Sequence, residues 1–412
     1  MAGLASKKNS VIFLYVCFTK NFENMTHKKL KTGMIGGGRG AFIGSIHRHA
    51  FQMDGLIELV CGAFSSTAEK AFASGQDLFL DDSRIYLDYK TMLETEAKMP
   101  AEKRIDFVTI VTPNHAHFEP AMMALDLGFH VVIEKPMTFT LDEAKLLHAK
   151  TQETGIRLCL THTYSGYPMV KQARAMFANN DFGKIRKIWV EYPQGWLSEL
   201  SEKEGNAQAA WRTDPNKSGK AGCMGDIGSH AAHLAEYISG LQITQLCANL
   251  NTVVDGRNLD DDGAVLLRFN NGASGVLIAS QVAAGEENAL KIKIHGERGG
   301  IEWHQMEPNT LLVKWIDKPT EILRAGANYT NLSPFMFQNC RTPGGHPEGY
   351  LEAFANIYRN FALTLMAESR GEKPTDVMLD FPNENDGVRG MAFIENVVAS
   401  GQSDMKWWDF EL

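Results

Sequence analysis

A lysine held between a glutamate and a proline is the first residue of this chain that could do chemistry. Glu134, Lys135 and Pro136 directly follow an apolar, strand-like run at 129–133. In an open α/β sheet, ligands bind along the edge formed by the carboxyl ends of the strands. A lysine at that edge can polarise a substrate oxygen, and desolvation can tune it for proton exchange near neutral pH. The alternative is a solvated lysine in a surface turn, the commoner situation for this residue type.

An aspartate and a histidine form the second candidate pair. Asp226 and His230 are four residues apart near the start of a helix predicted from about Gly225, so they would share one helical face. A carboxylate beside a histidine can orient the ring and stabilise its charged form, which favours a general base. His233 would lie on the same side, which leaves zinc binding as a rival hypothesis. The structural alternative is a helix whose histidines are satisfied in the core.

A glycine-rich turn indicates a dinucleotide site. Gly36, Gly38 and Ala41 fit the pattern G-x-G-x-x-A, between a strand-like run at 30–35 and a helical stretch that reaches Met53. That strand-to-helix context is the one the pattern requires. Glycines let the backbone approach a pyrophosphate, and the helix N-terminus supplies amide donors. The alternative is a glycine turn needed only for packing.

The second predicted strand leaves the cofactor type open. An acidic residue at the end of this strand would bind the ribose hydroxyls of NAD. Here Ser65 and Ser66 follow the strand instead, and Arg39 could contact the 2′-phosphate of NADP. The sequence therefore predicts NAD or NADP without choosing between them.

A third strand end would face the same edge. Thr112, Pro113 and Asn114 follow a buried strand, and His115 and His117 come next. A loop H-x-H without a nearby acidic cluster is more typical of hydrogen bonding than of a metal site. We expect no metal ligands in this chain.

The order of strands and helices predicts the fold class. Strand and helix signals alternate from about residue 30 to 160, which predicts a doubly wound parallel sheet. After about residue 165 strands follow one another, and Asn270-Asn271-Gly272 is a strong hairpin signal. The segment 323–347, rich in Gly, Asn and Pro, reads as a long loop. The fold class is therefore an α/β Rossmann domain followed by an α+β domain with a large, mostly antiparallel open sheet.

The domain boundaries follow from this change. We expect a disordered extension at 1–24, a dinucleotide-binding domain at 25–165, and a substrate-binding and oligomerisation domain at 166–412. An open sheet needs a cover for its second face, so a homodimer or homotetramer is expected.

Composition excludes several classes of protein. The 412 residues carry a net charge of −8 with no basic block, which argues against a nucleic-acid partner. The six cysteines form no C-x-x-C pair, which is typical of free thiols in a reducing compartment. The apolar run 11–18 lacks a cleavage site, and no run approaches the roughly 18 apolar residues that span a bilayer. We expect a cytoplasmic protein with no membrane partner.

Taken in order, these motifs resemble one known family. The glycine turn, the Thr-Pro-Asn and Glu-Lys-Pro strand ends and the Asp-x-Gly-x-His helix resemble the Gfo/Idh/MocA oxidoreductases over residues 29–412. The resemblance implies nicotinamide-dependent redox chemistry on sugars, cyclitols or their derivatives. It also implies catalytic roles for Lys135, Asp226 and His230, and places Trp211 and Arg212 near nicotinamide and substrate.

The chain departs from the family pattern in three places. His233 stands where the family helix often has an acid, which leaves the substrate open. The ribose acid is missing after the second strand. An insertion at 344–349 could bring His346 to the site, and the aromatic residues Tyr164 and Trp196 could line a sugar there.

The candidate contacts form two sets. The candidate cofactor contacts are Gly36, Gly38, Arg39, Gly40, Ala41, Phe42, Ser65, Ser66, Thr112, Pro113, Asn114, His117, Glu134, Lys135, Trp211 and Arg212. The candidate substrate contacts are Lys135, Tyr164, Trp196, Arg212, Asp226, His230 and His346.

The resulting hypothesis is a dehydrogenase acting on a secondary alcohol of a sugar, cyclitol or derivative. His230 would remove the hydroxyl proton, Asp226 would set its basicity, and Lys135 would polarise the same oxygen. One alternative is a glycoside-processing enzyme that uses tightly bound NAD for transient oxidation at C3. Another is a non-catalytic sensor that binds dinucleotide or sugar.

Overall fold

The computed structural model describes residues 28–412. The predicted extension at 1–24 lies outside the described residues. Within 28–412, no helix combines the length and the apolar character needed to cross a bilayer.

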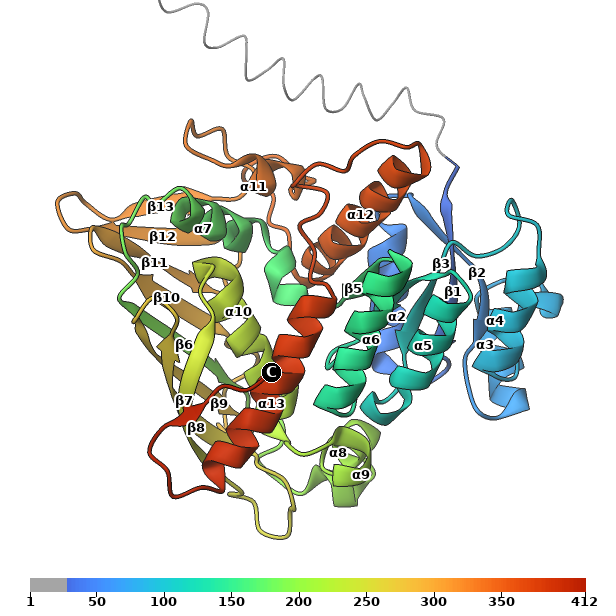
Figure 1. Ribbon diagram of the computed structural model, residues 1–412, viewed down its shortest axis with the longest axis horizontal. Coiled ribbons are helices and arrows are strands. Elements are labelled where there is room, and N and C mark those ends of the chain that lie inside the picture. The colour runs from blue at the N-terminus through green and yellow to red at the C-terminus, as the bar shows by residue number, and fades with distance from the viewer. Residues whose placement is uncertain (1–27) are drawn as a thin grey trace, which may run out of the picture.

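Five parallel strands form the first sheet, in the order β2-β1-β3-β4-β5 (Figure 1). They are β1 (Leu30–Gly36), β2 (Ile57–Ala63), β3 (Phe107–Val111), β4 (His130–Ile133) and β5 (Leu158–Leu160). The chain order changes direction between β1 and β3, which creates the crevice where α/β sheets bind ligands. The predicted doubly wound α/β domain is therefore confirmed.

Helices connect these strands and cover both faces of the sheet. They are α2 (Phe42–Gln52), α3 (Ala68–Asp77), α4 (Tyr89–Lys98), α5 (Phe118–Asp126) and α6 (Leu141–Thr154). Thr140 and Glu143 form a capping box at the start of α6. α6 ends at Gly155, whose φ of +69° is a left-handed conformation that glycine adopts without strain.

A helix from the far end of the chain completes this first domain. α12 (Tyr350–Ser369) packs against α2, and its Phe361 ring meets Phe107 of β3 edge-on at 5.4 Å. The neighbouring residue Val108 points to the opposite face, in one hydrophobic cluster with Leu125 of α5 and Leu147 of α6. The chain therefore returns to the parallel sheet after leaving it, and the predicted boundary at 165/166 is not a packing boundary.

A nine-stranded sheet forms the second domain, in the order β13-β12-β11-β10-β6-β9-β8-β7-β14. Its strands are β6 (Lys187–Pro193), β7 (Ile243–Asn251), β8 (Asp262–Phe269), β9 (Ser274–Ser280), β10 (Lys291–His295), β11 (Gly299–His304), β12 (Thr310–Trp315), β13 (Glu321–Arg324) and β14 (Trp408–Asp409). Only β6 and β9 pair in parallel, and the predicted hairpin at Asn270–Gly272 joins β8 to β9. The mostly antiparallel sheet is thus confirmed.

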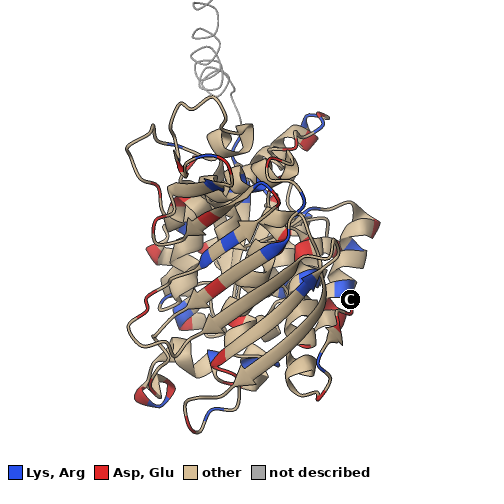
Figure 2. Cartoon of the chain, turned by 90° about the vertical axis from the view of Figure 1, so that its left-hand side faces the viewer, with Lys and Arg blue, Asp and Glu red and all other residues tan. Residues whose placement is uncertain are grey.

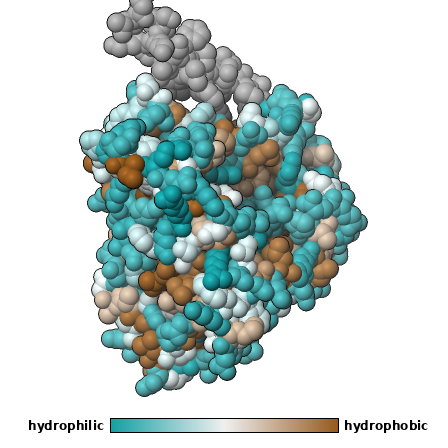
Figure 3. All heavy atoms as spheres, turned by 60° about the vertical axis from the view of Figure 1, so that its left-hand side comes forward, coloured by the Kyte–Doolittle hydropathy of each residue, from teal (hydrophilic) through white to brown (hydrophobic). Residues whose placement is uncertain are grey.

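Helices cover one face of this sheet and leave the other open. α7 (Pro168–Ala178), α10 (Ser229–Ser239) and α13 (Glu384–Gly401) lie between the two sheets (Figure 1). Figure 2 views the opposite face, where no helix lies over the strands and charged residues are scattered along them. Hydrophilic and hydrophobic side chains mix on this side of the molecule (Figure 3). Trp189, Leu266 and Ile278 are each more than 40% exposed on it.

Two elements lie in the segment predicted as a long loop. The edge strand β13 pairs with β12, and α11 (Pro334–Gln338) begins after Ser333, whose side chain caps the amide of Met336. Serine followed by proline at the first helical position is a helix-start signal. The prediction of a structureless loop over 323–347 was therefore wrong, because a short capped helix and an edge strand need few apolar residues.

Candidate active site

Lys135 sits at the carboxyl end of β4, and its neighbour Glu134 anchors it. Glu134 Oε1 accepts a hydrogen bond from Thr161 Oγ1 at 2.6 Å and lies 2.9 Å from His47 Nε2, while Oε2 accepts from the Lys135 amide at 3.1 Å. Burial opposes ionisation of Glu134, but the hydrogen bond and charge of His47 lower its pKa below the usual range. A buried, fully bonded carboxylate of this kind fixes the backbone that presents Lys135.

Lys135 forms an ion pair with Asp226 at the centre of the site. The Lys135 ammonium donates to Asp226 Oδ1 at 2.6 Å and to the Asp226 carbonyl oxygen at 2.8 Å. Asp226 Oδ2 accepts from Arg212 Nε at 3.1 Å and from Gln281 Nε2 at 2.9 Å. Burial alone would raise the pKa of Asp226, but the charges of Lys135 and then Arg212 lower it well below its usual range. The carboxylate stays ionised and holds two cations in place.

The segment that carries Asp226 differs from the predicted helix. Met224–Gly228 forms a π-helical turn, and α10 begins only at Ser229. Asp260 holds this turn, because its carboxylate accepts from the amides of Gly222 and Met224, each at 2.7 Å. Hydrogen bonds in a π turn run from i to i+5, so a four-residue spacing does not place side chains as an α-helix would.

His230 therefore has a different partner from the predicted one. The Asp226 oxygens bind Lys135, Arg212 and Gln281, whereas His230 Nδ1 lies 3.3 Å from Nδ1 of His162. Burial first, and then the Lys135 charge, hold the pKa of His230 well below its usual value, although Asp226 acts in the opposite direction. His230 is thus a neutral imidazole, with Asp226 acting on it through space.

Aromatic residues lie beside this centre. The Tyr164 ring meets His230 edge-on at 4.9 Å, and the Tyr164 hydroxyl is hydrogen-bonded to the Tyr192 hydroxyl. The Arg212 guanidinium lies 4.3 Å from the Trp211 ring centroid and 5.7 Å from that of Trp196. Arg212 and Trp211 end the short helix α8 (Ala207–Arg212). The structure brings these side chains together with Lys135 and Asp226.

The glycine turn has the shape that a dinucleotide needs. Gly36, Gly37 and Gly40 have positive φ values, and a Cβ on Gly38 would come within 2.8 Å of the Phe64 carbonyl oxygen. α2 starts after Ala41 with no side-chain cap and no acidic residue in its first turn. Its first amides are therefore available to an anion, so the residues present fit a pyrophosphate.

Several of the predicted cofactor contacts are exposed at the carboxyl edge of the parallel sheet. Arg39, Gly40, Phe42, Ser66 and Pro113 are exposed there. Ser65 begins the loop after β2 and accepts from the Thr67 amide at 3.3 Å.

Hydrogen bonds hold the strand end after β3. His117 is buried, with Nδ1 2.9 Å from the Pro136 carbonyl oxygen and Nε2 2.8 Å from that of Thr112. Asn114 donates to the Ser218 carbonyl oxygen at 3.0 Å. His117 therefore joins two neighbouring strand ends, because both of its ring nitrogens face backbone carbonyls. Among residues 28–412, no three His, Cys, Asp or Glu side chains are grouped to hold a metal ion.

Two predicted contacts, His346 and Arg39, have other partners in the structure. His346 is exposed, and its loop follows Arg341, whose side chain pairs with Asp54 just beyond the C-terminal end of α2. The glycine turn lies at the opposite end of α2, and the hydrogen bonds of His346 run to Thr342 and Pro343 of its own loop. Arg39 Nε donates to Asp77 at 2.5 Å and its Nη2 donates at 2.7 Å, so a carboxylate already occupies its guanidinium.

Three residues of the site were not predicted. Gln281 follows β9 and binds Asp226, Asp260 fixes the π turn, and His162 contacts His230. A signal existed only for His162, because the short apolar run Leu158-Cys159-Leu160 just before it is typical of a buried strand. Strand ends of a parallel sheet share one edge, so a histidine there was a candidate.

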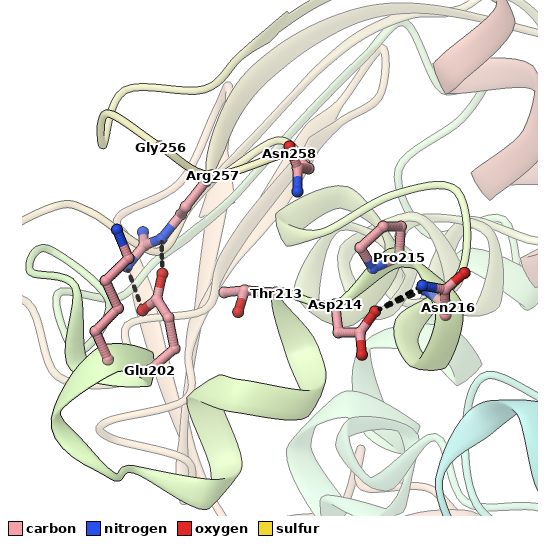
Figure 4. Close-up of a pocket in the computed structure, with 9 residues that line it drawn as sticks. Glu202, Thr213, Asp214, Pro215, Asn216, Gly256, Arg257 and Asn258 are labelled. Carbon is pink, nitrogen blue, oxygen red and sulfur yellow. Dashed lines mark hydrogen bonds and ion pairs between the residues drawn. The ribbon is translucent and has the colours of Figure 1, made fainter.

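A surface pocket adjoins the site on the Arg212 side. It has a volume of about 330 Å³ and lies between Glu202, Thr213, Asp214 and Arg257 (Figure 4). A smaller cavity shares Thr213 and Arg257 with it and reaches Arg212 and Gln281. Arg257 Nε donates to Glu202 at 3.0 Å, so the main charges of the pocket are already paired.

Fold and site together define the class of protein. A parallel-sheet domain with an anion-binding glycine turn, joined to an open-sheet domain that closes a Lys–Asp–His centre over it, is a Rossmann-fold oxidoreductase. Residues 30–162 match the oxidoreductase family with an NAD-binding Rossmann fold, and residues 170–302 match the GFO/IDH/MocA C-terminal domain. The chain belongs to the Gfo/Idh/MocA family of oxidoreductases.

Similar proteins cover almost the whole chain. An uncharacterized oxidoreductase of Bacillus subtilis (strain 168), YfiI, is 32% identical over 394 residues, covering 95% of this chain and 99% of its own. The crystal structure of an inositol dehydrogenase homolog from Azotobacter vinelandii complexed with NAD+ is 34% identical, with a TM-score of 0.88, over 93% of this chain and 98% of that one. The same homolog complexed with NADH and myo-inositol is 33% identical, with a TM-score of 0.84 and the same coverage. Levoglucosan dehydrogenase of Pseudarthrobacter phenanthrenivorans (strain DSM 18606 / JCM 16027 / LMG 23796 / Sphe3) is 25% identical over 69% of this chain and 76% of its own.

Proposed function

We propose that this oxidoreductase is an NAD-dependent dehydrogenase that oxidises a secondary alcohol of a cyclitol or sugar, or reduces the corresponding ketone. The observation that carries the proposal is the Lys135–Asp226 ion pair beside the dinucleotide edge, with the buried His230 four residues after Asp226. The similarity to a homolog complexed with NADH and myo-inositol supports a polyol as the substrate class.

Lys135 is arranged to bind the reacting oxygen. An ammonium group has three donors, and two of them bind the Oδ1 and carbonyl oxygens of Asp226. The third is left for a substrate hydroxyl. As that hydroxyl loses its proton, the negative charge that develops on the oxygen is stabilised by the fixed cation.

His230 is arranged to take the proton. A neutral imidazole in a buried site can accept a proton at Nε2, because Nδ1 is engaged with His162. NAD, when bound, supplies the acceptor for the hydride that leaves the carbinol carbon. Arg212 and the Trp196 and Trp211 rings would bind the remaining hydroxyls and the apolar ring face of the substrate.

NAD is favoured over NADP by the charges at the glycine turn. The exposed Arg39 is paired with Asp77, and the hydrogen bond from Arg39 lowers the pKa of that carboxyl. A 2′-phosphate would have to displace Asp77 and would add negative charge beside it.

A homodimer or homotetramer is part of the proposal. The outer face of the large sheet carries the exposed Trp189, Leu266 and Ile278 and has no covering helix (Figure 2). A second copy would bury these side chains. Light scattering in solution tests this, and a monomer at micromolar concentration would contradict it.

The function is tested with a panel of cyclitols, aldoses and glycosides, each with NAD+ and NADP+, followed by nicotinamide absorbance. We expect turnover of at least one polyol with NAD+. His230→Ala should lower turnover by roughly 10²–10⁴-fold while cofactor binding, measured by fluorescence, stays unchanged. The matched control is His49→Ala, because His49 is exposed on α2.

The alternatives give different outcomes in the same panel. NAD that copurifies with the protein and is never consumed would favour transient C3 oxidation of a glycoside. Dinucleotide binding without turnover of any polyol would favour a sensor.

A further inference from the structure

His162 is a buried histidine whose part in the proposed chemistry has so far been only its contact with Nδ1 of His230. It follows β5, next to the strand β4 that presents Lys135, and only 2% of its surface is exposed. A buried imidazole is costly unless its nitrogens are used. Its Nδ1 is used, because it lies 3.3 Å from Nδ1 of His230.

Only one arrangement of protons on this pair allows His230 to act as a base. Two ring nitrogens in contact require one proton between them, carried by one ring and accepted by the other. A base at His230 Nε2 needs its own proton on Nδ1, so the Nδ1 of His162 must be the acceptor. The opposite arrangement would put a proton on His230 Nε2 and make this histidine an acid.

The packing around His162 holds its ring in this orientation. The His233 ring stacks on it at 4.2 Å with an interplanar angle of 9°. His233 Nε2 in turn lies 3.4 Å from Asp386 Oδ1, at the start of α13. The charged and titratable groups near the His162–His230 pair are Lys135, Asp226, Tyr164, His233 and Asp386.

We propose that His162 is a positioning residue for the proposed dehydrogenation, on which this inference rests. Its Nδ1 accepts the hydrogen bond from Nδ1–H of His230, which fixes the tautomer of His230 and leaves Nε2 free for the hydroxyl proton. When that proton arrives, the His230 cation keeps a hydrogen bond to an uncharged ring. His162 thus occupies the place usually given to a carboxylate, the place in which the sequence put Asp226.

Deuterium positions test the pair without any substrate. In neutron diffraction from crystals of the whole protein in D2O, we expect a deuteron on His230 Nδ1 directed at His162. A deuteron on His162 Nδ1 directed at His230, or rings too far apart to bond, would overturn the proposal. The neutron result does not depend on turnover of a polyol. A negative neutron result can therefore be told apart from failure of the proposed function.

Two variants test the consequence for turnover. His162→Phe keeps a ring but removes the acceptor, and we expect kcat to fall by about 10- to 100-fold, the scale for a hydrogen bond to a charged group. KM for NAD should not change. His162→Asn keeps an acceptor near the position of Nδ1 and should recover most of the lost rate, while the control His49→Phe should match the wild type. A His162→Phe enzyme with full kcat, or a His162→Asn enzyme as slow as His162→Phe, would refute the role.

Discussion

The molecule contains two clusters of lysine, aspartate and arginine with nearly the same internal bonding. In the edge cluster (Lys135, Asp226, Arg212), the ammonium binds both the carboxylate and the carbonyl oxygen of one aspartate. In the core cluster (Lys171, Asp380, Arg174), Lys171 Nζ binds Asp380 Oδ2 at 2.7 Å and its carbonyl oxygen at 3.0 Å. Arg212 and Arg174 each form an ion pair with the aspartate of their own cluster. The Arg212 guanidinium lies 4.3 Å from the Trp211 ring centroid, and that of Arg174 lies 4.4 Å from the Tyr237 ring centroid.

What separates the clusters is their surroundings. The Lys135 and Asp226 side chains are 14% and 13% exposed, whereas those of Lys171 and Asp380 are 1% and 2% exposed. The third side chain bonded to the Asp380 carboxylate is Tyr237, whose hydroxyl donates at 2.7 Å, so the core cluster ties α7, α10 and the segment before α13 together. The edge cluster instead joins a strand end to the π turn beside a neutral histidine. The same three residue types are therefore buried in the core in one place and reach the sheet edge in the other, where we propose that they serve chemistry.

The largest expected effect separates the two lysines. Lys135→Met should lower kcat/KM by roughly 10²–10⁴-fold, because the developing charge on the substrate oxygen loses its cation. Lys171→Met should lower the free energy of unfolding by about 3–5 kcal/mol, because it leaves Asp380 buried without its main partner. Initial rates and urea unfolding, both measured on both variants, check this.

The two lysine variants should also differ in the assay in which each is expected to change least. The Lys135 and Asp226 side chains are partly exposed to solvent, whereas those of Lys171 and Asp380 are almost fully buried, so Lys135→Met should lose less stability than Lys171→Met. Folded Lys171→Met protein should keep wild-type specific activity. If the two lysines had equal effects in both assays, the clusters would not differ in role.

Local motifs account for what the sequence could predict. The end of β4, the glycine turn and the position of His230 each follow from a few adjacent residues, so the sequence alone places Lys135 at the cofactor edge. The choice of partners could not be predicted, because Asp226 lies 91 residues from Lys135 and 55 from Gln281. The π turn then changes which neighbour the carboxylate reaches.

The core cluster could not be predicted from the sequence, for a related reason. Lys171 lies on a helix that would ordinarily expose a lysine, and its partner Asp380 is 209 residues away. The return of α12 to the parallel sheet is equally non-local, since its apolar positions fit any buried face. Sequence patterns predict elements and their ends, whereas the approach of distant elements decides which buried charges meet.

Lowering the pH should reduce the stability of the protein in two separate pH ranges, one set by the buried histidines beside the edge cluster and one by the two aspartates. Folded His162 and His230 have pKa values well below the ordinary 6.5, first because of burial. The unfolded chain therefore binds protons first as pH falls, so this contribution to stability is complete above about pH 6.5 and declines below it. Asp226 and Asp380 also have lowered pKa values, and their contribution is lost only below about pH 4.

Urea unfolding at a series of pH values measures the loss of stability in both pH ranges. His230→Asn should reduce the loss of stability between pH 6.5 and 5 by up to about 1.4 kcal/mol per pH unit, the value for one proton. His130, whose pKa burial lowers to about 4, remains in this window in both proteins. An unchanged slope in His230→Asn would mean that this ring is charged in the folded state.

The smallest expected effect separates the two arginines. Arg212→Lys keeps the charge but loses the planar group that bonds Asp226 and lies over Trp211, so KM for the polyol should rise a few-fold. The Arg174 side chain is 44% exposed, so Arg174→Lys should change the free energy of unfolding by less than about 1 kcal/mol and leave KM unchanged. Steady-state kinetics and urea unfolding of both variants check this pair. A raised KM in Arg174→Lys would show that the core cluster communicates with the site, through Tyr237 and the His233 ring that lies 5.7 Å from it.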